Sequence, residues 1–237
     1  MTTYSTKIKG ETSEEKLKKA KLLSRIIGWP SFFVSLGAIF PKTQIILVTI
    51  SLLFPLLTIA ALKVNKLVHL EDKKNSPFLS IVSGFLWPVI CLGVLLDNQL
   101  SILNLNNLWA PSLALFVILA LVLSTGNNSL NFNSGKGIAR AVLVLAFIYL
   151  YCFIAGVTVN CLYDKATPAE YPVKVIDKYS GGIKTTKYYL VVEQWHTAKT
   201  RPEEKVSSAV YRRTQIGDTV TISCRPGILG VEWYKVY

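Results

Sequence analysis

The stretch that decides the fold is the end of the chain, 222–237, which reads ISCRPGILGVEWYKVY. Polar and apolar residues alternate on both sides of Pro226-Gly227, so it predicts a β-hairpin. The sequence before it is very different. The 237 residues are 51% hydrophobic and only 17% charged, against about 25% charged in a typical soluble domain. Long stretches almost without charge indicate membrane spans, so we expect a small β-structure attached to a membrane protein.

Working outward from this hairpin, the whole tail has strand character. From about residue 168 the hydrophobic period changes from helical to two. YPVKVIDKYS alternates up to Gly181-Gly182, and KTTKYYLVVEQW is rich in β-branched and aromatic residues. With the later segments this gives about five strands and predicts a small all-β domain over 168–237, an OB- or SH3-like barrel. Its predicted core is Val175, Tyr189, Val191, Val220, Ile222, Ile228 and Trp233, with Trp233 inside the barrel.

Before the tail, the segments 22–40, 45–61, 77–96, 108–124 and 141–159 are long and apolar enough to cross a bilayer. At 1.5 Å per residue they measure about 26–30 Å, close to the hydrocarbon thickness. The predicted fold class is therefore a membrane α-helical bundle of about five transmembrane helices, followed by the small β-domain. The predicted domains are a cytoplasmic basic segment over 1–21, a transmembrane helical domain over 22–160, and the β-domain.

Charge in the connections predicts the orientation, because Lys and Arg are retained on the cytoplasmic side. Segments assigned to the inside carry thirteen Lys and Arg, and the two connections between spans that are assigned to the outside carry Lys42 alone. The thirteen are Lys7, Lys9, Lys16, Lys18, Lys19, Lys21, Arg25, Lys63, Lys66, Lys73, Lys74, Lys136 and Arg140. We expect a multi-pass protein of the bacterial inner (cell) membrane, with a cytoplasmic N-terminus and an extracytoplasmic β-domain.

The basic N-terminal segment is expected to lie on the bilayer surface. Its residues Lys16, Lys18, Lys19, Lys21 and Arg25 are predicted to contact anionic lipid headgroups, with a cytoplasmic partner site as the alternative. The formal net charge of +12 would suggest nucleic acid in a soluble protein. Here the basic residues flank apolar segments, so we expect no nucleic-acid partner.

The sequence carries no motif that fixes a catalytic activity. Its two histidines, His69 and His196, lie outside the predicted spans and are not accompanied by Cys-x-x-Cys, so a metal site is not expected. NFNSGKGIAR lacks the full phosphate-binding loop pattern. The spans hold no buried Asp, Glu, His or Arg of the kind that ion-coupled carriers use. We therefore expect no enzyme, no catalytic residue and no cofactor.

Five residues are candidates for a disulfide or for partner contacts in the β-domain. Cys161 and Cys224 are predicted either to form a bridge in an oxidising compartment or to be two reduced, buried thiols. Trp195, Tyr234 and Tyr237 are candidates for contacts with a protein partner.

The segments IGDTV and RPGILGVEWY, with the Gly-Gly hairpin, resemble uncharacterised bacterial inner-membrane proteins that append a small β-domain to a helical bundle. NfeD-type proteins share this architecture, but their glycine-rich pattern is not matched, so their role is not carried over. We expect a non-enzymatic integral membrane protein whose extracytoplasmic β-domain mediates protein binding or assembly, as an accessory or immunity-type factor. A small uncoupled transporter or channel subunit, which would need an oligomer or a polar cavity, is the alternative; a row of Ser, Thr and Asn on one helix face would favour it.

Overall fold

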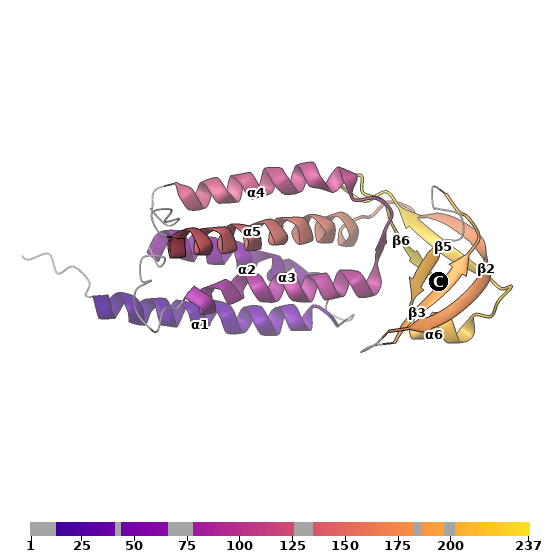
Figure 1. Cartoon of the computed structure of the whole chain (residues 1–237), viewed down its shortest axis with the longest axis horizontal. Helices are drawn as coiled ribbons and strands as arrows, with labels where there is room; N and C mark the ends of the chain where they lie inside the picture. The colour runs from indigo at the N-terminus through magenta and orange to yellow at the C-terminus, as the bar shows by residue number, and fades with distance from the viewer. Residues whose placement is uncertain (1–12, 41–43, 66–77, 126–134, 183–185, 197–201) are drawn as a thin grey trace, which may run out of the picture. The chain divides into compact units, whose positions relative to one another are not determined.

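The computed structural model describes residues 13–40, 44–65, 78–125, 135–182, 186–196 and 202–237. Five long helices precede the tail, each overlapping one predicted span (Figure 1). They are α1 (Ser13–Gly37), α2 (Gln44–Asn65), α3 (Phe78–Gln99), α4 (Trp109–Ser124) and α5 (Gly135–Leu162). Of the predicted cytoplasmic segment, 1–12 lies outside the described residues.

These helices differ in the length of their apolar stretches. Within the described ranges two helical stretches are long and apolar enough to cross a membrane, Asn106–Ser124 and Ala141–Leu162. Two shorter apolar stretches are Ile45–Ala61 in α2 and Ser83–Asp97 in α3. Helices with membrane-spanning character are therefore present in the region where the sequence predicts them.

The tail forms a small β-domain, as predicted. Its antiparallel strands pair in the order β1-β6-β5-β2-β3-β4 and curl into a nearly closed, barrel-like sheet (Figure 1). The strands are β1 (Ser101–Ile102), β2 (Ala169–Gly181), β3 (Lys187–Val192), β4 (Glu203–Val206), β5 (Thr219–Arg225) and β6 (Trp233–Val236), and the short helix α6 (Ser208–Arg213) follows β4. Five of these strands belong to the tail. The sixth, β1, comes from the connection between α3 and α4 and was not predicted; the choice between OB-like and SH3-like stays a prediction.

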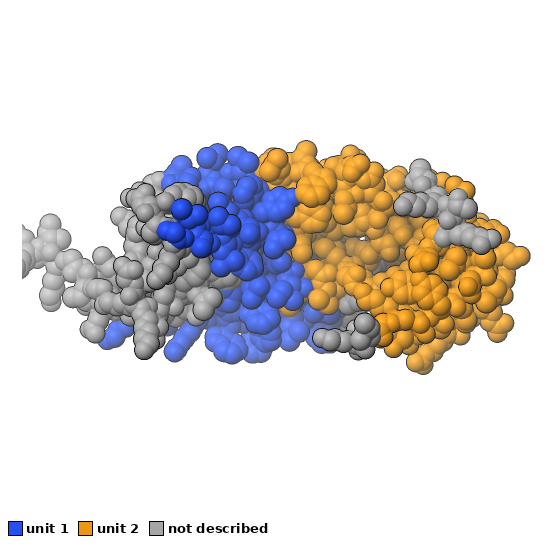
Figure 2. Space-filling view, viewed as in Figure 1, with its two compact units in different colours: residues 1–90, 116–151 blue, residues 91–115, 152–237 orange. Residues whose placement is uncertain are grey.

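The chain divides into two compact units, 1–90 with 116–151 and 91–115 with 152–237 (Figure 2). The first unit contains α1, α2 and parts of α3, α4 and α5. In it the Phe32 ring on α1 contacts the Trp87 ring on α3 edge-on, with 4.7 Å between ring centroids. The Tyr151 hydroxyl of α5 donates to the Leu52 carbonyl of α2, 2.7 Å away.

The second unit contains the sheet, α6 and the ends of α3, α4 and α5 that belong to it. It has two hydrophobic clusters. The barrel cluster fills the concave side of the sheet and consists of Val173, Val175, Leu190, Val192, Trp195, Val210, Val220, Ile222 and Cys224. The anchor cluster joins the β6 hairpin to the helix ends and consists of Leu96, Leu108, Val157, Cys161, Val231 and Trp233.

The predicted core is confirmed in part. Val175, Val220 and Ile222 are buried in the barrel cluster. Trp233 is buried too, but in the anchor cluster, so its placement inside the barrel was wrong. Ile228 is 53% exposed, because it lies in the turn between β5 and β6 and not on a strand.

The two remaining core predictions, Tyr189 and Val191, chose the wrong face of β3. Leu190 and Val192 are fully buried, whereas Tyr189 and Val191 are only partly buried. Neighbouring residues of a strand point to opposite faces of the sheet, so an assignment that is wrong by one position puts the outward residues in the core and the inward residues on the surface. The run from Tyr188 to Val192 is apolar throughout, and its alternation therefore could not select the inward set.

Candidate functional site

The turn between β5 and β6 is held by the last residues of α5. The Asn160 side chain donates through Nδ2 to the Val231 carbonyl at 2.8 Å and accepts through Oδ1 from the Leu229 amide at 2.9 Å. A further bond joins the Ile228 amide to the Asn160 carbonyl at 3.3 Å. Because one buried amide satisfies two backbone groups of the turn, the turn and the helix end form one rigid element.

Asp164 completes this attachment just beyond α5. Its Oδ2 accepts from the Gly227 amide at 2.9 Å and from the Trp233 indole Nε1 at 3.1 Å, and its Oδ1 accepts from the Ala166 amide at 2.8 Å. Burial by itself would raise the pKa of Asp164, but these hydrogen bonds and the nearby Arg225 charge together lower it. The carboxylate is therefore held in its charged form.

Gly227 is required by this attachment. Its φ is +72°, and a Cβ there would collide with the Asn160 side chain and the Val231 carbonyl. Only glycine adopts this backbone conformation at so little cost. The Pro226-Gly227 pair that predicted the hairpin thus also allows the turn to approach the helix closely.

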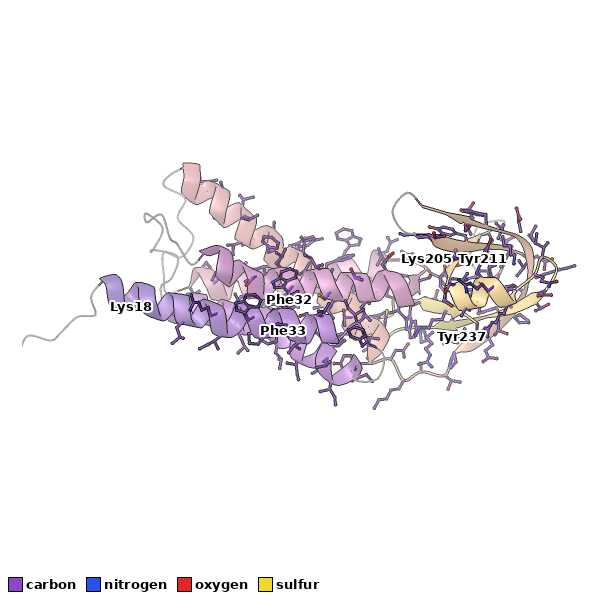
Figure 3. The ribbon with its side chains drawn as sticks, turned by 90° about the horizontal axis from the view of Figure 1, so that it is seen from below. Lys18, Phe32, Phe33, Lys205, Tyr211 and Tyr237 are labelled. Carbon is purple, nitrogen blue, oxygen red and sulfur yellow. The ribbon has the colours of Figure 1, made fainter. Side chains whose placement is uncertain are left out.

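The connection between α3 and α4 contributes to the same unit. The Asn107 side chain donates to the Gly230 carbonyl at 2.8 Å, and β1 pairs with β6 through Ser101 and Tyr234. Asp97, at the end of α3, accepts from the Lys205 ammonium of β4 at 2.7 Å and lies 3.8 Å from that of Lys187. Lys205 is labelled in Figure 3.

The interior of the barrel contains a buried carboxyl group. Glu204 on β4 is 2% exposed, and its Oε1 accepts from the Trp195 indole Nε1 at 3.2 Å. Within the described residues its Oε2 makes no hydrogen bond. Burial raises the pKa of Glu204, and the donors Tyr234 and Trp195 lower it less. This acid therefore favours its neutral form relative to an exposed glutamate.

A polar cross-tie lies beside this carboxyl group. The Tyr171 hydroxyl of β2 is 3.3 Å from His196 Nδ1, and His196 Nε2 is 3.4 Å from Glu232 Oε2. His196 has a φ of 44°, a left-handed conformation uncommon for any residue but glycine. The cross-tie joins β2, the segment after β3 and the residue before β6.

The outer surface of β2, β3 and β4 carries an ordered aromatic patch, which we call the tyrosine face: Tyr179, Tyr189, Val191 and Glu203. The rings of Tyr179 and Tyr189, directly paired across β2 and β3, stack with 5.1 Å between centroids and 18° between planes. The Tyr179 hydroxyl donates to Glu203 Oε2 at 2.6 Å, a bond that raises the pKa of Tyr179 to about 12. Tyr179 is 39% exposed, so the patch is both ordered and accessible.

A bulge in β2 explains why the tyrosines point outward. The register with β3 shifts between Val175 and Asp177, which leaves Ile176 as the extra residue and exchanges the faces of the residues beyond it. Lys178 then points inward, where its ammonium donates to the carbonyls of Tyr211 and Thr214 at the end of α6. Tyr179, the next residue, is consequently on the outer face.

The three predicted partner residues differ in their exposure, and their contact with a partner stays a prediction. Trp195 is 4% exposed and belongs to the barrel cluster. Tyr234 is partly buried against the same cluster. Tyr237 is 57% exposed (Figure 3). The tyrosine face was missed, because the sequence prediction assigned Tyr189 and Val191 to the core.

The predicted headgroup residues all lie in α1. The side chains of Lys18 and Arg25 are exposed, and Figure 3 labels Lys18 near the start of this helix. The side chains of Lys16, Lys19 and Lys21 lie outside the described residues. Their contact with lipid stays a prediction.

The two cysteines of the predicted bridge are free and buried. Cys161 belongs to the anchor cluster and Cys224 to the barrel cluster. Burial, followed by the charge of Glu232, raises the pKa of the Cys224 thiol. The second alternative, two reduced and buried thiols, describes this structure.

Four buried hydroxyl residues lie on α1 and α2 in the first unit. Ser31, Ser35, Ser51 and Thr58 are each 0% exposed, and the hydroxyl oxygens of Ser35 and Ser51 are 2.6 Å apart. A row of such residues would favour a transport path if water reached it. Full burial is instead typical of the small polar residues through which membrane helices pack closely.

Within the described ranges, no group of three His, Cys, Asp or Glu side chains could hold a metal ion. No family model, curated protein or solved structure matches this chain. Any functional assignment must therefore come from the geometry of the chain itself. The tyrosine face combines stacked rings, a fixed hydroxyl group and exposure to solvent.

Proposed function

We propose that this chain is an integral membrane protein whose five long helices cross the inner membrane, with a cytoplasmic N-terminus and an extracytoplasmic β-domain. The thirteen-to-one distribution of Lys and Arg supports this orientation. The pairing of β1 with β6 agrees with it. An orientation with five crossings assigns the α3–α4 connection and the tail to the same side of the membrane, and these two segments share one sheet.

We further propose that the β-domain is a non-enzymatic docking module for another protein. The observation that carries this proposal is the stacked Tyr179–Tyr189 pair, with its hydroxyl fixed by Glu203. Tyrosine offers a large, rigid and amphipathic contact surface, and few rotamers have to be frozen on binding. It is accordingly enriched among the residues that dominate interface energies.

The attachment of the β-domain supports the same function. Asn160 and Asp164 fix the β5–β6 turn to the end of α5, and β5 pairs directly with β2, the strand that carries Tyr179. A surface held in this way loses little conformational entropy when a partner binds. The β-domain would therefore present the tyrosine face as a preformed surface.

The test is co-purification of the tagged chain in mild detergent, in three variants. Tyr179→Ala should reduce recovery of the partner at least tenfold, corresponding to about 1.4 kcal/mol of lost binding energy. Ile216→Ala is the matched control, because Ile216 is 59% exposed but lies outside the tyrosine face. It should leave recovery unchanged. Tyr237→Ala examines the partner contact predicted from the sequence.

The result distinguishes a protein partner from self-association. A partner species lost with Tyr179→Ala and kept with Ile216→Ala supports docking through the tyrosine face. A second copy of the chain as the retained species makes the function homo-oligomeric assembly. Equal recovery in wild type and Tyr179→Ala, with thermal stability unchanged, contradicts the assignment of this face.

A further inference from the structure

A cavity of about 180 Å³ lies at the foot of α5, on the convex side of the β5–β6 pair. Its walls include Cys161, Leu162 and the carboxylate residue Asp164 at the helix end, Ser223 and Arg225 from β5, and Trp233 and Lys235 from β6. Ser223 pairs with Lys235, and Arg225 pairs with Trp233. Their side chains therefore project from the same face of the sheet, opposite the barrel cluster.

Two cations converge on one aromatic ring in this cavity. The Arg225 guanidinium carbon is 5.5 Å from the centroid of the Trp233 ring, and the Lys235 ammonium is 5.7 Å from it. Cation–π attraction accounts for each contact separately. It acts against the repulsion between the two like charges, which is stronger where they are partly removed from water.

Neither cation has an ion-pair partner within the described part of the chain. Arg225 donates through Nη1 to the Asp164 carbonyl at 3.2 Å. The Asp164 carboxylate, which lines the same cavity, accepts from the N–H groups of Ala166, Gly227 and Trp233, and the nearby Arg225 charge helps to lower its pKa. The acidic residue Glu170 on β2 pairs with Ser223 on β5, and Ser223 pairs with Lys235 on β6, so Glu170 and Lys235 are separated by one strand. Burial, and next the charge of Arg225, lower the pKa of Lys235.

We propose that this cavity binds the phosphate group of an anionic phospholipid. The ligand chemistry follows from the convergent charges: Arg and Lys are the side chains that bind phosphate oxygens most strongly, and the Ser223 hydroxyl adds a donor. The lipid source follows from position. The apolar stretch Ala141–Leu162 ends at the residues that line the cavity, so the cavity lies at headgroup depth if α5 crosses the membrane.

This inference rests on the proposed membrane position, and it adds a role for the anchor. On β6, Trp233 packs against the helix end, and the neighbouring side chain on the same face, Lys235, would bind the headgroup layer. A bound headgroup would neutralise the two cations and hold the β-domain against the bilayer surface. Phosphate binding and attachment of the domain are then coupled through Trp233.

The experiment uses the full chain, delipidated in detergent and titrated with phosphatidylglycerol, with phosphatidylcholine or with inorganic phosphate. Native mass spectrometry counts the retained lipid, and the thermal unfolding midpoint reports binding of phosphate. Wild type should retain phosphatidylglycerol in preference to phosphatidylcholine. Lys235→Gln should weaken retention about fivefold, the contribution typical of one basic residue at an anionic membrane, and Lys235→Arg should restore it.

The matched control is Lys174→Gln, because Lys174 is exposed on the convex side of β2 and outside the cavity. It should leave retention unchanged. Equal loss in Lys174→Gln and Lys235→Gln overturns the site, as does equal retention of the two lipids by wild type. Stabilisation by inorganic phosphate without preference for phosphatidylglycerol makes the cavity a site for a soluble anion and overturns the lipid assignment.

A flotation assay separates this proposal from the proposed function. Wild type that floats with vesicles but shows no headgroup preference overturns the cavity assignment alone. Wild type that fails to associate with vesicles overturns the membrane position, and the lipid proposal with it. Circular dichroism of each variant confirms that lost retention does not come from unfolding.

Discussion

The barrel cluster and the anchor cluster of the second unit are assembled from different parts of the chain. The barrel cluster takes all its buried members from the tail, from Val173 to Cys224. The anchor cluster joins Leu96 and Leu108 to Trp233, residues more than a hundred positions apart. The comparison shows that the β-domain closes its own core, whereas its attachment depends on the helix ends.

Each region also contains a buried carboxyl group, and the pKa values of the two groups are shifted in opposite directions. Asp164, beside the anchor cluster, accepts three N–H donors, and its pKa is lowered. Glu204, in the barrel, has an oxygen without a partner among the described residues, and its pKa is raised. Burial favours the neutral form of both acids; at Asp164 the hydrogen bonds and the Arg225 charge together outweigh it, and at Glu204 the donors Tyr234 and Trp195 do not.

The largest effect is expected from Trp233→Ala, which removes the centre of the anchor cluster. Truncation of a buried aromatic side chain costs about 3–5 kcal/mol, and the indole bond to Asp164 is lost with it. The thermal unfolding midpoint in detergent should fall. Hydrogen exchange should increase first in the β5–β6 turn and at the end of α5. A midpoint unchanged from wild type would contradict the burial of this ring.

A comparable but differently located effect is expected from Leu190→Ala in the barrel cluster. Leu190 is 0% exposed, and removal of a buried leucine side chain costs about 2–5 kcal/mol. Hydrogen exchange should increase in β3 and β4, while the β5–β6 turn stays protected. The same exchange pattern in Leu190→Ala and Trp233→Ala would show that the two clusters unfold together.

A smaller, pH-dependent effect is expected from Glu204→Gln. Because its folded pKa is raised, Glu204 contributes stability that is fully present below its unfolded pKa, about 4.3, and is lost as pH rises through the folded value. Glu204→Gln should remove this loss, so the unfolding midpoint should vary less as pH rises above about 4.3. Asp164→Asn should instead make the unfolding midpoint depend less on pH in the acid range, because the pKa of Asp164 is lowered in the folded state. Identical pH profiles for wild type and Glu204→Gln would contradict the raised pKa of Glu204.

The smallest expected effect concerns the thiols. Cys161 and Cys224 are free and lie in different clusters, so reduction should change nothing. Maleimide trapping of protein denatured without reductant should label all 4 cysteines. Labels that appear at two further sites only after reduction would show the bridge that the sequence also allowed.

The sequence predicted the helices and strands well, and it predicted the contacts that join them poorly. The Gly-Gly hairpin, the strands of the tail and the positions of the long helices follow from periodicity and turn residues, which are local signals. The anchor does not, because Asn160 and Asp164 are ordinary residues until the fold brings Gly227 to them. The tyrosine face was missed for a related reason, since the bulge at Ile176 and the register of β3 are set by pairing with neighbouring strands.

Labelling of single introduced cysteines in intact cells with a membrane-impermeant maleimide tests the central claim most directly. Lys18→Cys, Asn104→Cys and Lys165→Cys replace exposed residues of α1, the α3–α4 connection and the tail, and the wild-type chain, whose cysteines are buried, is the background control. The account predicts that Asn104→Cys and Lys165→Cys react and that Lys18→Cys reacts only after the membrane is opened. Opposite labelling of Asn104→Cys and Lys165→Cys, or reaction of Lys18→Cys in intact cells, would contradict it.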